Sequence, residues 1–537
     1  MSTSDTARPL AQLPERVEIF DTTLRDGSQR EGLSLTVADK LRVAEQLDHL
    51  GVDYIEGGWP GANPKDAEFF ERAPADLRLE RAQLVAFGST RRAGARAADD
   101  EVLRNLVKAG TSTACIVAKS WDYHVTEALR TSLDEAVSMV ADSIEFLTEA
   151  GVAVFLDAEH FFDGYRRNPD FALRVLRAAH DAGAVRLILC DTNGGTLPAE
   201  VERIVGEVHA ALPGAGLGGH FHDDTGCAVA NALAAVRQGA VQIQGCINGY
   251  GERTGNTNLS TLIPNLTLKM GVETVPRERL ELLTPVSHHI AEIVNLALDP
   301  QAPYVGNSAF AHKAGLHASA IARARDAYEH VDPEAVGNLT RFVVSEMAGK
   351  STLALKASEL GLELSDAQLT DVLDRLKTLE HAGYHFEVAD GSFELLLRGA
   401  GGWTQSFFSL ESYRIIVERL ADGEVTTEAT IKIHVDGRRI IATGEGNGPV
   451  NALDQALRQA IGHAYPSLPA IHLTDYKVRV LDTHKGTGAV TRVLLDSADA
   501  ERTWSTIGVS ENVIEASWDA LCDSIVYGLL AAASPAP

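Results

Sequence analysis

The sequence predicts an α/β protein built on a TIM barrel, followed by a helical connector and a C-terminal α+β domain. From about residue 15 to residue 285, eight short apolar runs alternate with amphipathic helical stretches. This alternation is typical of parallel strands covered by helices, and eight repeats indicate a closed barrel. The eight runs are VEIFD (17–21), DYIEG (53–57), LVAFG (84–88), ACIVA (114–118), AVFLD (153–157), LILCD (187–191), GGHFH (218–222) and VQIQG (241–245).

The segments between these runs have the pattern and the endings of helices. VADKLRVAEQLDHLG (37–51) and AVANALAAVRQGA (228–240) end at glycine or alanine before the next strand, as a helix C-terminus does. An open, doubly wound sheet is the alternative fold. No glycine-rich fingerprint follows the first strand, where that fold usually binds a dinucleotide, so the barrel is preferred.

The repeat stops after about residue 286, and segments rich in Ala, Glu and Leu predict helices up to about residue 398. RGAGGWTQSF (398–407) breaks the composition. Beyond this break, ATIKIHVDGRRIIATG predicts a hairpin, followed by a helix, two strands and a last helix. We therefore expect a disordered tail (1–14), a barrel (15–285), a helical connector (286–400) and a C-terminal α+β domain (401–537).

Composition excludes several classes of partner. The 537 residues carry 48 Lys and Arg against 74 Asp and Glu, a formal net charge of −26. This balance argues against a nucleic-acid or anionic-membrane partner, and no run approaches the roughly 18 apolar residues of a membrane span. The N-terminus has no secretory signal pattern, and no cysteines form a CxxC pair. We therefore expect a cytoplasmic location and five buried, unpaired cysteines, Cys115, Cys190, Cys227, Cys246 and Cys522.

Polar side chains follow the predicted strands on the face of a TIM barrel that carries the chemistry. His220 and His222 lie two residues apart on one strand, so both project to the same face and begin a divalent-metal site. Two hydrogen-bonding histidines are the alternative. Asp26, after the first strand, offers a carboxylate opposite them, and this donor set suits Mg²⁺, Mn²⁺ or Zn²⁺. The polar residues at the strand ends are Asp21, Arg25, Asp26, Glu56, Glu159, Asp191, Thr192, His220, His222 and Asn248.

Four segments resemble the Claisen-condensing branch of the DRE-TIM metallolyases, which includes the isopropylmalate, homocitrate and citramalate synthases. They are FDTTLRDGSQREG, HFHDD, NGYGERTGNTNL and HKAGLHASA, in the family's order. The resemblance covers about residues 15 to 350, and the C-terminal part is similar to the family's amino-acid-binding regulatory domain. YIEGGWPGANPKD, GNSAFAHKAGLHASA and YEHVDPEAVGN are closest to one group of citramalate synthases.

The resemblance implies a metal site made by Asp26, His220, His222 and Asn256. It also implies that Arg25 faces the oxygen that gains negative charge, where a fixed cation is effective. An ion-paired surface arginine is the alternative for Arg25.

Further roles follow from the same resemblance. Glu56 completes the Asp-Arg-Glu signature and orients Arg25 through charge-assisted hydrogen bonds. Glu159 and Thr192 contact the 2-oxo acid, and Gln29 is a substrate-binding or supporting donor. A helix N-cap ahead of Leu197 is the alternative for Thr192.

His317 resembles a histidine that the connector of the partner subunit brings to the active site, where its pKa range suits acid–base work. Many relatives have Asp two residues later, where this chain has Ser319. His312 is the alternative to His317.

The resemblance implies an acyltransferase, a homodimer that condenses acetyl-CoA with pyruvate, using a divalent metal, to give citramalate and CoA for isoleucine biosynthesis. It further implies isoleucine as an effector at the C-terminal domain. The same chemistry on 2-oxoisovalerate or 2-oxoglutarate is the nearest alternative, because the pocket walls decide the substrate. A lyase, a metal-dependent hydrolase and a non-enzymatic effector-binding protein are further alternatives. The strings GEGNGP (444–449) and HKGTG (484–488) lack a nucleotide-binding spacing and predict turns.

Overall fold

The computed structural model describes residues 13–312, 324, 328–342, 350–403, 406–481, 483–500 and 502–533. The chain divides into two compact units. The first contains Met1–Phe310 and His330–Thr340, and the second contains Ala311–Glu329 and Arg341–Pro537. Each unit is described by itself below.

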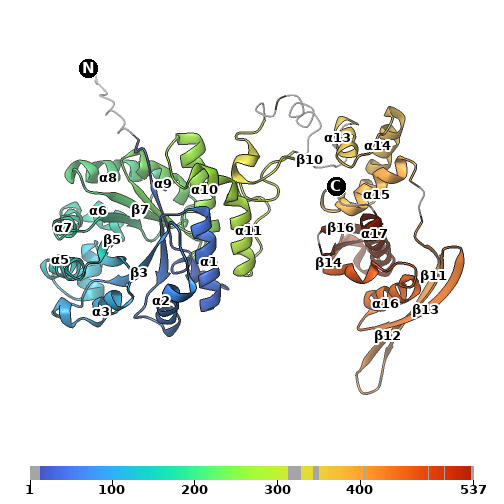
Figure 1. Cartoon of the computed structure of the whole chain (residues 1–537), viewed down its shortest axis with the longest axis horizontal. Coiled ribbons are helices and arrows are strands. Elements are labelled where there is room, and N and C mark those ends of the chain that lie inside the picture. Colours follow the sequence, from blue (N-terminus) through green and yellow to red (C-terminus); the bar gives the residue numbers. More distant parts are fainter. Residues whose placement is uncertain are drawn as a thin grey trace. The chain divides into compact units, whose positions relative to one another are not determined.

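Eight parallel strands close a TIM barrel in the first unit (Figure 1). The strand β1 pairs with both β2 and β8, which closes the ring and excludes the open sheet. All eight predicted strand runs are confirmed within a few residues. The strands are β1 (Glu18–Asp21), β2 (Tyr54–Gly58), β3 (Gln83–Ser89), β4 (Thr113–Lys119), β5 (Ala153–Glu159), β6 (Arg186–Asp191), β7 (Leu217–Phe221) and β8 (Gln242–Gly245).

Helices cover the outside of the barrel, as the alternating pattern predicts. In α1, Thr36 and Asp39 form a capping box at the start, and Gly51 ends the helix with φ of 96°. The helices of this unit are α1 (Val37–Leu50), α2 (Pro64–Asp76), α3 (Glu101–Lys108), α4 (Asp122–His124), α5 (Leu133–Glu149), α6 (Phe161–Arg167), α7 (Pro169–Asp181), α8 (Pro198–Ala211), α9 (Ala228–Arg237), α10 (Leu259–Pro264) and α11 (Leu283–Ile293).

Aromatic side chains fill the barrel interior. The rings of Phe20 and Phe155 lie 6.0 Å apart, and Tyr54 meets Phe155 edge-on at 5.1 Å. Val85, Phe87 and Cys115 complete this buried cluster. Because apolar side chains pack the interior, it is a core and no channel, and the polar strand ends are left at one face.

The C-terminal part of the second unit repeats one arrangement, three antiparallel strands followed by a helix that packs on them. The sheet β11-β12-β13 carries α16, and the sheet β14-β15-β16 carries α17. The predicted hairpin is confirmed, and Asp436 and Gly437 make its turn with positive φ. The elements are β11 (Ser409–Arg419), β12 (Val425–Val435), β13 (Arg438–Gly446), α16 (Pro449–Ile461), β14 (His472–Val480), β15 (Thr491–Ala498), β16 (Thr503–Ser510) and α17 (Val513–Ala533).

The prediction of only four strands in this part was wrong, because it missed β11 and β16. The strand β11 lies at a sheet edge and its residues are exposed or half-buried on both faces. It therefore lacks the alternation of apolar and polar residues that reveals a strand buried on one face. The strand β16 is short and rich in Ser and Thr.

Residues 286–400 do not all pack on the same part of the chain. The helix α11 packs on α1 of the barrel, whereas α15 packs on α17 and β16. Leu369, Phe386 and Leu397 share a buried cluster with Ile507 of β16. Whether residues 286–400 act as a separate domain stays a prediction. The other elements here are β9 (Ala311–His312), β10 (Arg341–Phe342), α13 (Lys350–Glu359), α14 (Asp366–His381) and α15 (Asp390–Ala400).

The structure also bears on the predicted burial of the five cysteines and on membrane-spanning helices. Cys115, Cys190 and Cys246 are buried, but Cys227 and Cys522 are partly exposed, so the expectation of five buried cysteines was wrong for these two. Cys227 lies just before α9, at the surface where the chain turns into the helix. Among the described residues, no helix is long and apolar enough to cross a membrane.

Candidate active site

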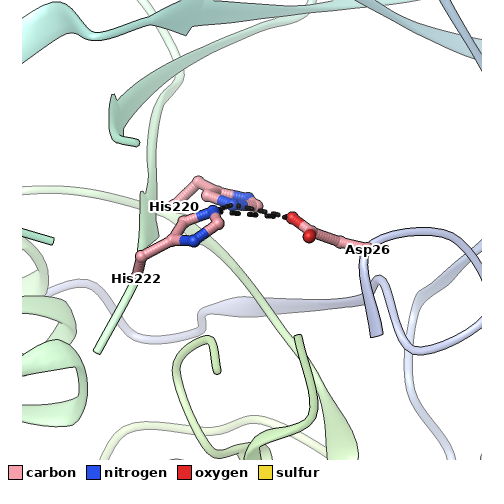
Figure 2. A group of neighbouring side chains, drawn as sticks. All are labelled: Asp26, His220 and His222. Atoms are coloured by element: carbon pink, nitrogen blue, oxygen red, sulfur yellow. Dashed lines mark hydrogen bonds and ion pairs between the residues drawn. The ribbon is translucent and has the colours of Figure 1, made fainter. Parts of the chain in front are cut away.

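Three predicted metal ligands meet at the carboxyl ends of the barrel strands. Asp26 follows β1, whereas His220 and His222 come from β7 and the residue after it. Figure 2 shows the Asp26 carboxylate facing both imidazoles. Asp26 Oδ2 lies 3.3 Å from His220 Nε2 and 3.6 Å from His222 Nε2, and the two Nε2 atoms lie 3.1 Å apart. All three side chains are buried, and one ligand atom of each lies within 4.8 Å of the others.

Asn256 lies beside this group, on the loop after β8. An isolated antiparallel bridge joins it to His222, which brings its side chain to the carboxylate. Asn256 Nδ2 donates to Asp26 Oδ2 at 2.9 Å and lies 3.3 Å from His220 Nε2. The fourth predicted ligand is therefore adjacent to the other three.

The charges of the site depend on burial and on close neighbours. Burial alone would raise the pKa of Asp26, but the charge of the neighbouring Arg25 opposes this rise, and the pKa lies well below its usual range. Burial and the neighbouring His220 lower the pKa of His222 to about 3. His222 is thus neutral near pH 7, the form of imidazole that binds metals.

These residues fit a divalent cation. The buried oxygens Asp26 Oδ1 and Asn256 Oδ1 have no hydrogen-bond partner in the part of the chain that the structure describes. Buried oxygens are rarely left without a partner, and a carboxylate, a carboxamide oxygen and two imidazoles form a donor set that suits Mg²⁺, Mn²⁺ or Zn²⁺. Asn256 fits once its carboxamide turns over, so that Oδ1 replaces Nδ2 beside Asp26.

Two residues that the sequence analysis missed support His220 from behind. Gln244 Oε1 lies 2.8 Å from His220 Nδ1, and Gln244 Nε2 donates to Asp157 Oδ1 at 2.9 Å. Gln244 is fully buried, and Asp157 is 4% exposed. The available signal was a polar residue within or at the end of a predicted strand run, Gln244 in VQIQG and Asp157 in AVFLD.

Arg253 contacts the other ring nitrogen of His222. Arg253 Nη2 lies 3.1 Å from His222 Nδ1 and also donates to Asp224 Oδ2 and to the Thr192 carbonyl. Arginine only donates, so His222 Nδ1 accepts here. For His222 Nε2 to bind a cation, its proton would have to move to Nδ1, and Arg253 would keep only its other two acceptors.

Arg25 is held on three sides at the same strand ends. Its Nε donates to Glu56 Oε2 at 2.6 Å, and its Nη1 lies 3.4 Å from Asp26 Oδ2. Its guanidinium lies 3.9 Å from the centre of the Phe87 ring, which Trp59 meets edge-on at 5.4 Å. The Arg25 side chain is only 14% exposed, so it is no ordinary surface arginine.

The predicted substrate-binding residues line one cavity of about 270 Å³ together with Arg25, Asp26 and the two histidines. Glu159 forms an ion pair with Lys119, a residue that the sequence analysis missed. Thr192 Oγ1 accepts from the His160 backbone N–H at 2.8 Å. The N-cap of α8 is Leu197, so the helix-cap alternative for Thr192 was wrong. Gln29 also lines the cavity.

Three polar residues at the strand ends, Asp21, Asp191 and Asn248, form hydrogen bonds with loop and helix residues and do not line the cavity. Asp21 accepts from Thr23 and from the backbone of Ile247, and Asp191 accepts from Thr196. Asn248 donates to the carbonyl of Ser287. Their bonds shape the turns that follow the strands.

Two histidines, His317 and His312, were predicted as the acid–base candidates. His317 falls outside the described residues, so its role stays a prediction. His312 lies in β9 of the second unit, with its Nε2 3.5 Å from Glu329 Oε1.

Comparison with known proteins decides the family. A family model described as HMGL-like matches residues 16–283, the homocitrate synthase post-HMGL domain-like model matches 304–383, and the LeuA allosteric (dimerisation) domain matches 387–529. The (R)-citramalate synthase of Streptomyces coelicolor is 54% identical over 97% of this chain and 98% of its own. The one of Aquifex aeolicus is 49% identical over 96% and 98%. The chain belongs to the (R)-citramalate synthase family.

A relative that is named a 2-isopropylmalate synthase is more distant. The probable 2-isopropylmalate synthase of Methanopyrus kandleri is 32% identical over 94% of this chain and 97% of its own. The predicted family and the predicted enzyme class, an acyltransferase, are confirmed for this citramalate synthase family member. The C-terminal match agrees with the predicted likeness to the family's regulatory domain.

Proposed function

We propose that this protein condenses acetyl-CoA with pyruvate to give (R)-citramalate and CoA. Its relatives named (R)-citramalate synthase include five that are 43–54% identical over nearly the whole chain. The observation that carries the proposal within the structure is the convergence of Asp26, His220 and His222 beside Arg25 in one cavity. These residues make a site for the carboxylate and keto oxygens of a small 2-oxo acid.

In the proposed site, Asp26, His220, His222 and Asn256 hold a divalent cation. When bound, such a cation supplies polarisation of a carbonyl group and neutralisation of an oxyanion. Asn256 Nδ2, which donates to Asp26 Oδ2 in the structure, would give way to Asn256 Oδ1 when the cation binds.

Arg25 has the position for stabilising developing negative charge. It is fixed by Glu56 and Phe87, so it does not have to reorganise when charge develops on an oxygen in the cavity. Thr192 and Glu159 at the cavity wall orient the 2-oxo acid, and Gln29 assists them. Glu56 positions Arg25 and takes no part in the proton transfers between the substrates.

The proposed reaction consists of a condensation followed by hydrolysis of the thioester. A base removes a methyl proton from acetyl-CoA, the resulting carbanion attacks the keto carbon of pyruvate, and the keto oxygen takes a proton. Water then cleaves the thioester, and CoA leaves as a free thiol. We propose His317, with His312 as the alternative, for the proton transfers, because imidazole titrates near neutral pH.

We further propose a homodimer that forms through residues 387–529, with isoleucine as an effector there. The match to the LeuA allosteric (dimerisation) domain supports this proposal. Exposed apolar side chains on the strands of this region also support it, since they suit burial by a second copy. Val417, Val425 and Ile441 are 55%, 52% and 55% exposed, and Val478 and Val480 are 47% and 48% exposed.

Thiol release tests the proposed reaction. Purified protein with Mn²⁺ or Mg²⁺, acetyl-CoA and one 2-oxo acid at a time should release thiol with pyruvate, and chelation of the metal should stop it. Release with 2-oxoisovalerate or 2-oxoglutarate alone would replace pyruvate by that acid. No release with any acid would contradict the condensation itself.

A further inference from the structure

Gln244 and Asp157 form a buried chain of hydrogen bonds that ends on His220. His220 and Gln244 are register partners of the neighbouring strands β7 and β8, so their side chains project together into the barrel. Asp157 reaches Gln244 from β5, on another part of the ring. The chain thus crosses the barrel interior and approaches His220 from the side opposite to Asp26 (Figure 2 shows the Asp26 side).

In each hydrogen bond of this chain, only one assignment of donor and acceptor satisfies both partners. An ionised carboxylate only accepts, so Asp157 requires the NH₂ group of Gln244 to point at it. The carboxamide oxygen of Gln244 then points at His220 Nδ1, which must carry a proton in order to donate. A neutral imidazole has one proton, so Nε2 keeps its lone pair and directs it at Asp26.

The reversed arrangement is unfavourable. If the carboxamide of Gln244 turned over, its oxygen would face the Asp157 carboxylate and its NH₂ group would face His220 Nδ1. Nδ1 would then accept, and the proton would move to Nε2, the nitrogen beside Asp26. Two acceptors, the Gln244 oxygen and the Asp157 carboxylate, would then face each other in a buried position, which is costly.

We infer that Gln244 and Asp157 are positioning residues that hold His220 in the tautomer with a free Nε2. The inference rests on the metal site of the proposed function and adds two residues to it. Asp157 acts at a distance, by deciding which way the Gln244 carboxamide points. Bonds of this kind behind a histidine ligand commonly change metal affinity by about 10- to 100-fold.

Mn²⁺ affinity tests the inference without substrate and without activity. Gln244→Met removes the acceptor for Nδ1 at a similar side-chain volume, and we expect about 10- to 100-fold weaker Mn²⁺ binding, measured by EPR of free Mn²⁺. Gln242→Met is the matched control, because Gln242 is also fully buried on β8 but donates to Glu18 at 2.9 Å. We expect this control to bind Mn²⁺ as the parent does.

Gln244→Glu separates positioning from packing. Two close carboxyl groups share a proton, so the introduced carboxyl group in its acid form donates to Asp157 and still accepts from His220 Nδ1. We expect this variant to bind Mn²⁺ more tightly than Gln244→Met, although burying a second carboxyl group makes it the less stable variant to heat. A purely structural role predicts the same order for stability and affinity.

Asp157→Asn tests the far end of the chain. Its carboxamide can donate or accept, so it no longer dictates the direction of Gln244, and we expect a smaller loss of Mn²⁺ affinity than in Gln244→Met. Parent-like Mn²⁺ binding by a folded Gln244→Met variant would overturn the inference and leave the proposed function intact. A parent that binds no Mn²⁺, Mg²⁺ or Zn²⁺ would overturn the proposed metal site and the inference together.

Discussion

The barrel and the C-terminal α+β region bury different kinds of polar group. The buried polar residues of the barrel include carboxylates, imidazoles and carboxamides, among them Asp26, Glu56, Asp157, His220 and Gln244. In the described part of residues 406–533, the buried polar residues are the serines and threonines Thr427, Thr491, Ser497, Thr506, Ser517 and Ser524. A hydroxyl is easily satisfied by a nearby carbonyl, whereas a buried charge requires dedicated partners.

The two regions therefore stabilise their buried polar groups in different ways. The barrel surrounds each buried charge with partners, as Glu56 and Phe87 surround Arg25. In the C-terminal region the hydroxyls bond to backbone or to each other, as Thr506 does to the Ala520 carbonyl and Ser497 to Ser524. Changing a carboxylate to its carboxamide should therefore harm the barrel site and leave the C-terminal region intact or improve it.

Among such carboxylate-to-carboxamide variants, Asp26→Asn should have the largest effect, on metal affinity and on activity. The Asp26 carboxylate faces two imidazoles and is the one carboxylate among the four proposed ligands, so neutralising it removes the negative charge of the ligand set. Losing a hydrogen bond behind a metal ligand costs about 10- to 100-fold in metal affinity, so we expect loss of the anionic ligand itself to cost at least about 100-fold. Mn²⁺ titration by EPR and thiol release with pyruvate measure the loss. Parent-like Mn²⁺ affinity in this variant would remove Asp26 from the metal site.

Glu56→Gln should have an intermediate effect confined to turnover. Burial raises the pKa of Glu56 to about 7, although Arg25 opposes this rise. As pH falls through this value, protonation of Glu56 removes the charge that orients Arg25, so the parent should lose activity on the acid side of pH 7. The carboxamide mimics the protonated form, and we expect about a 10-fold lower kcat with a flatter acid limb.

The matched measurement for this variant is metal affinity. Glu56 contacts Arg25 and none of the four proposed ligands, so Mn²⁺ binding should stay at the parent value. A large loss of Mn²⁺ affinity in Glu56→Gln would show that Glu56 belongs to the metal site instead.

The sequence predicted the barrel strands and most of the candidate site for one physical reason. Strands buried on both faces read as apolar runs, and chemistry-bearing residues come directly after them. Asp26, His220 and His222 were therefore found from their places at strand ends, and all three meet in the structure. Asn256 lies on a loop, and only the family resemblance identified it.

Gln244 and Asp157 were not predicted, because their importance depends on contacts that the sequence does not display. Each lies inside or at the end of an apolar run, and they meet only because ring closure brings β8 and β5 together across the interior. Lys119 was missed for the same reason, since its partner Glu159 is 40 residues away. The edge strand β11 was missed because exposure on both faces removes the alternating pattern.

Asp523→Asn should have the smallest effect of the series and the opposite sign. Asp523 of α17 is only partly buried and accepts from Ser392 Oγ at 2.6 Å. This burial raises its pKa from 3.8 to about 6, with a further rise from Asp519. A carboxyl group with a raised pKa in the folded state stabilises the fold below its unfolded pKa and loses that contribution as pH rises through the folded value. The parent therefore loses stability between about pH 4 and pH 6.

Asparagine keeps an oxygen that accepts from Ser392 and has no charge to bury. We expect Asp523→Asn to match the parent below this pH window and to be more stable by about 1 kcal/mol above it, in urea unfolding of the full-length protein. Asp422→Asn is the control, because Asp422 lies in the exposed turn between β11 and β12 and its Oδ1 accepts from the Glu424 backbone, which asparagine retains. A loss of stability above the window would mean that the Asp523 charge is itself used, and the contrast between the two regions would then fail at this residue.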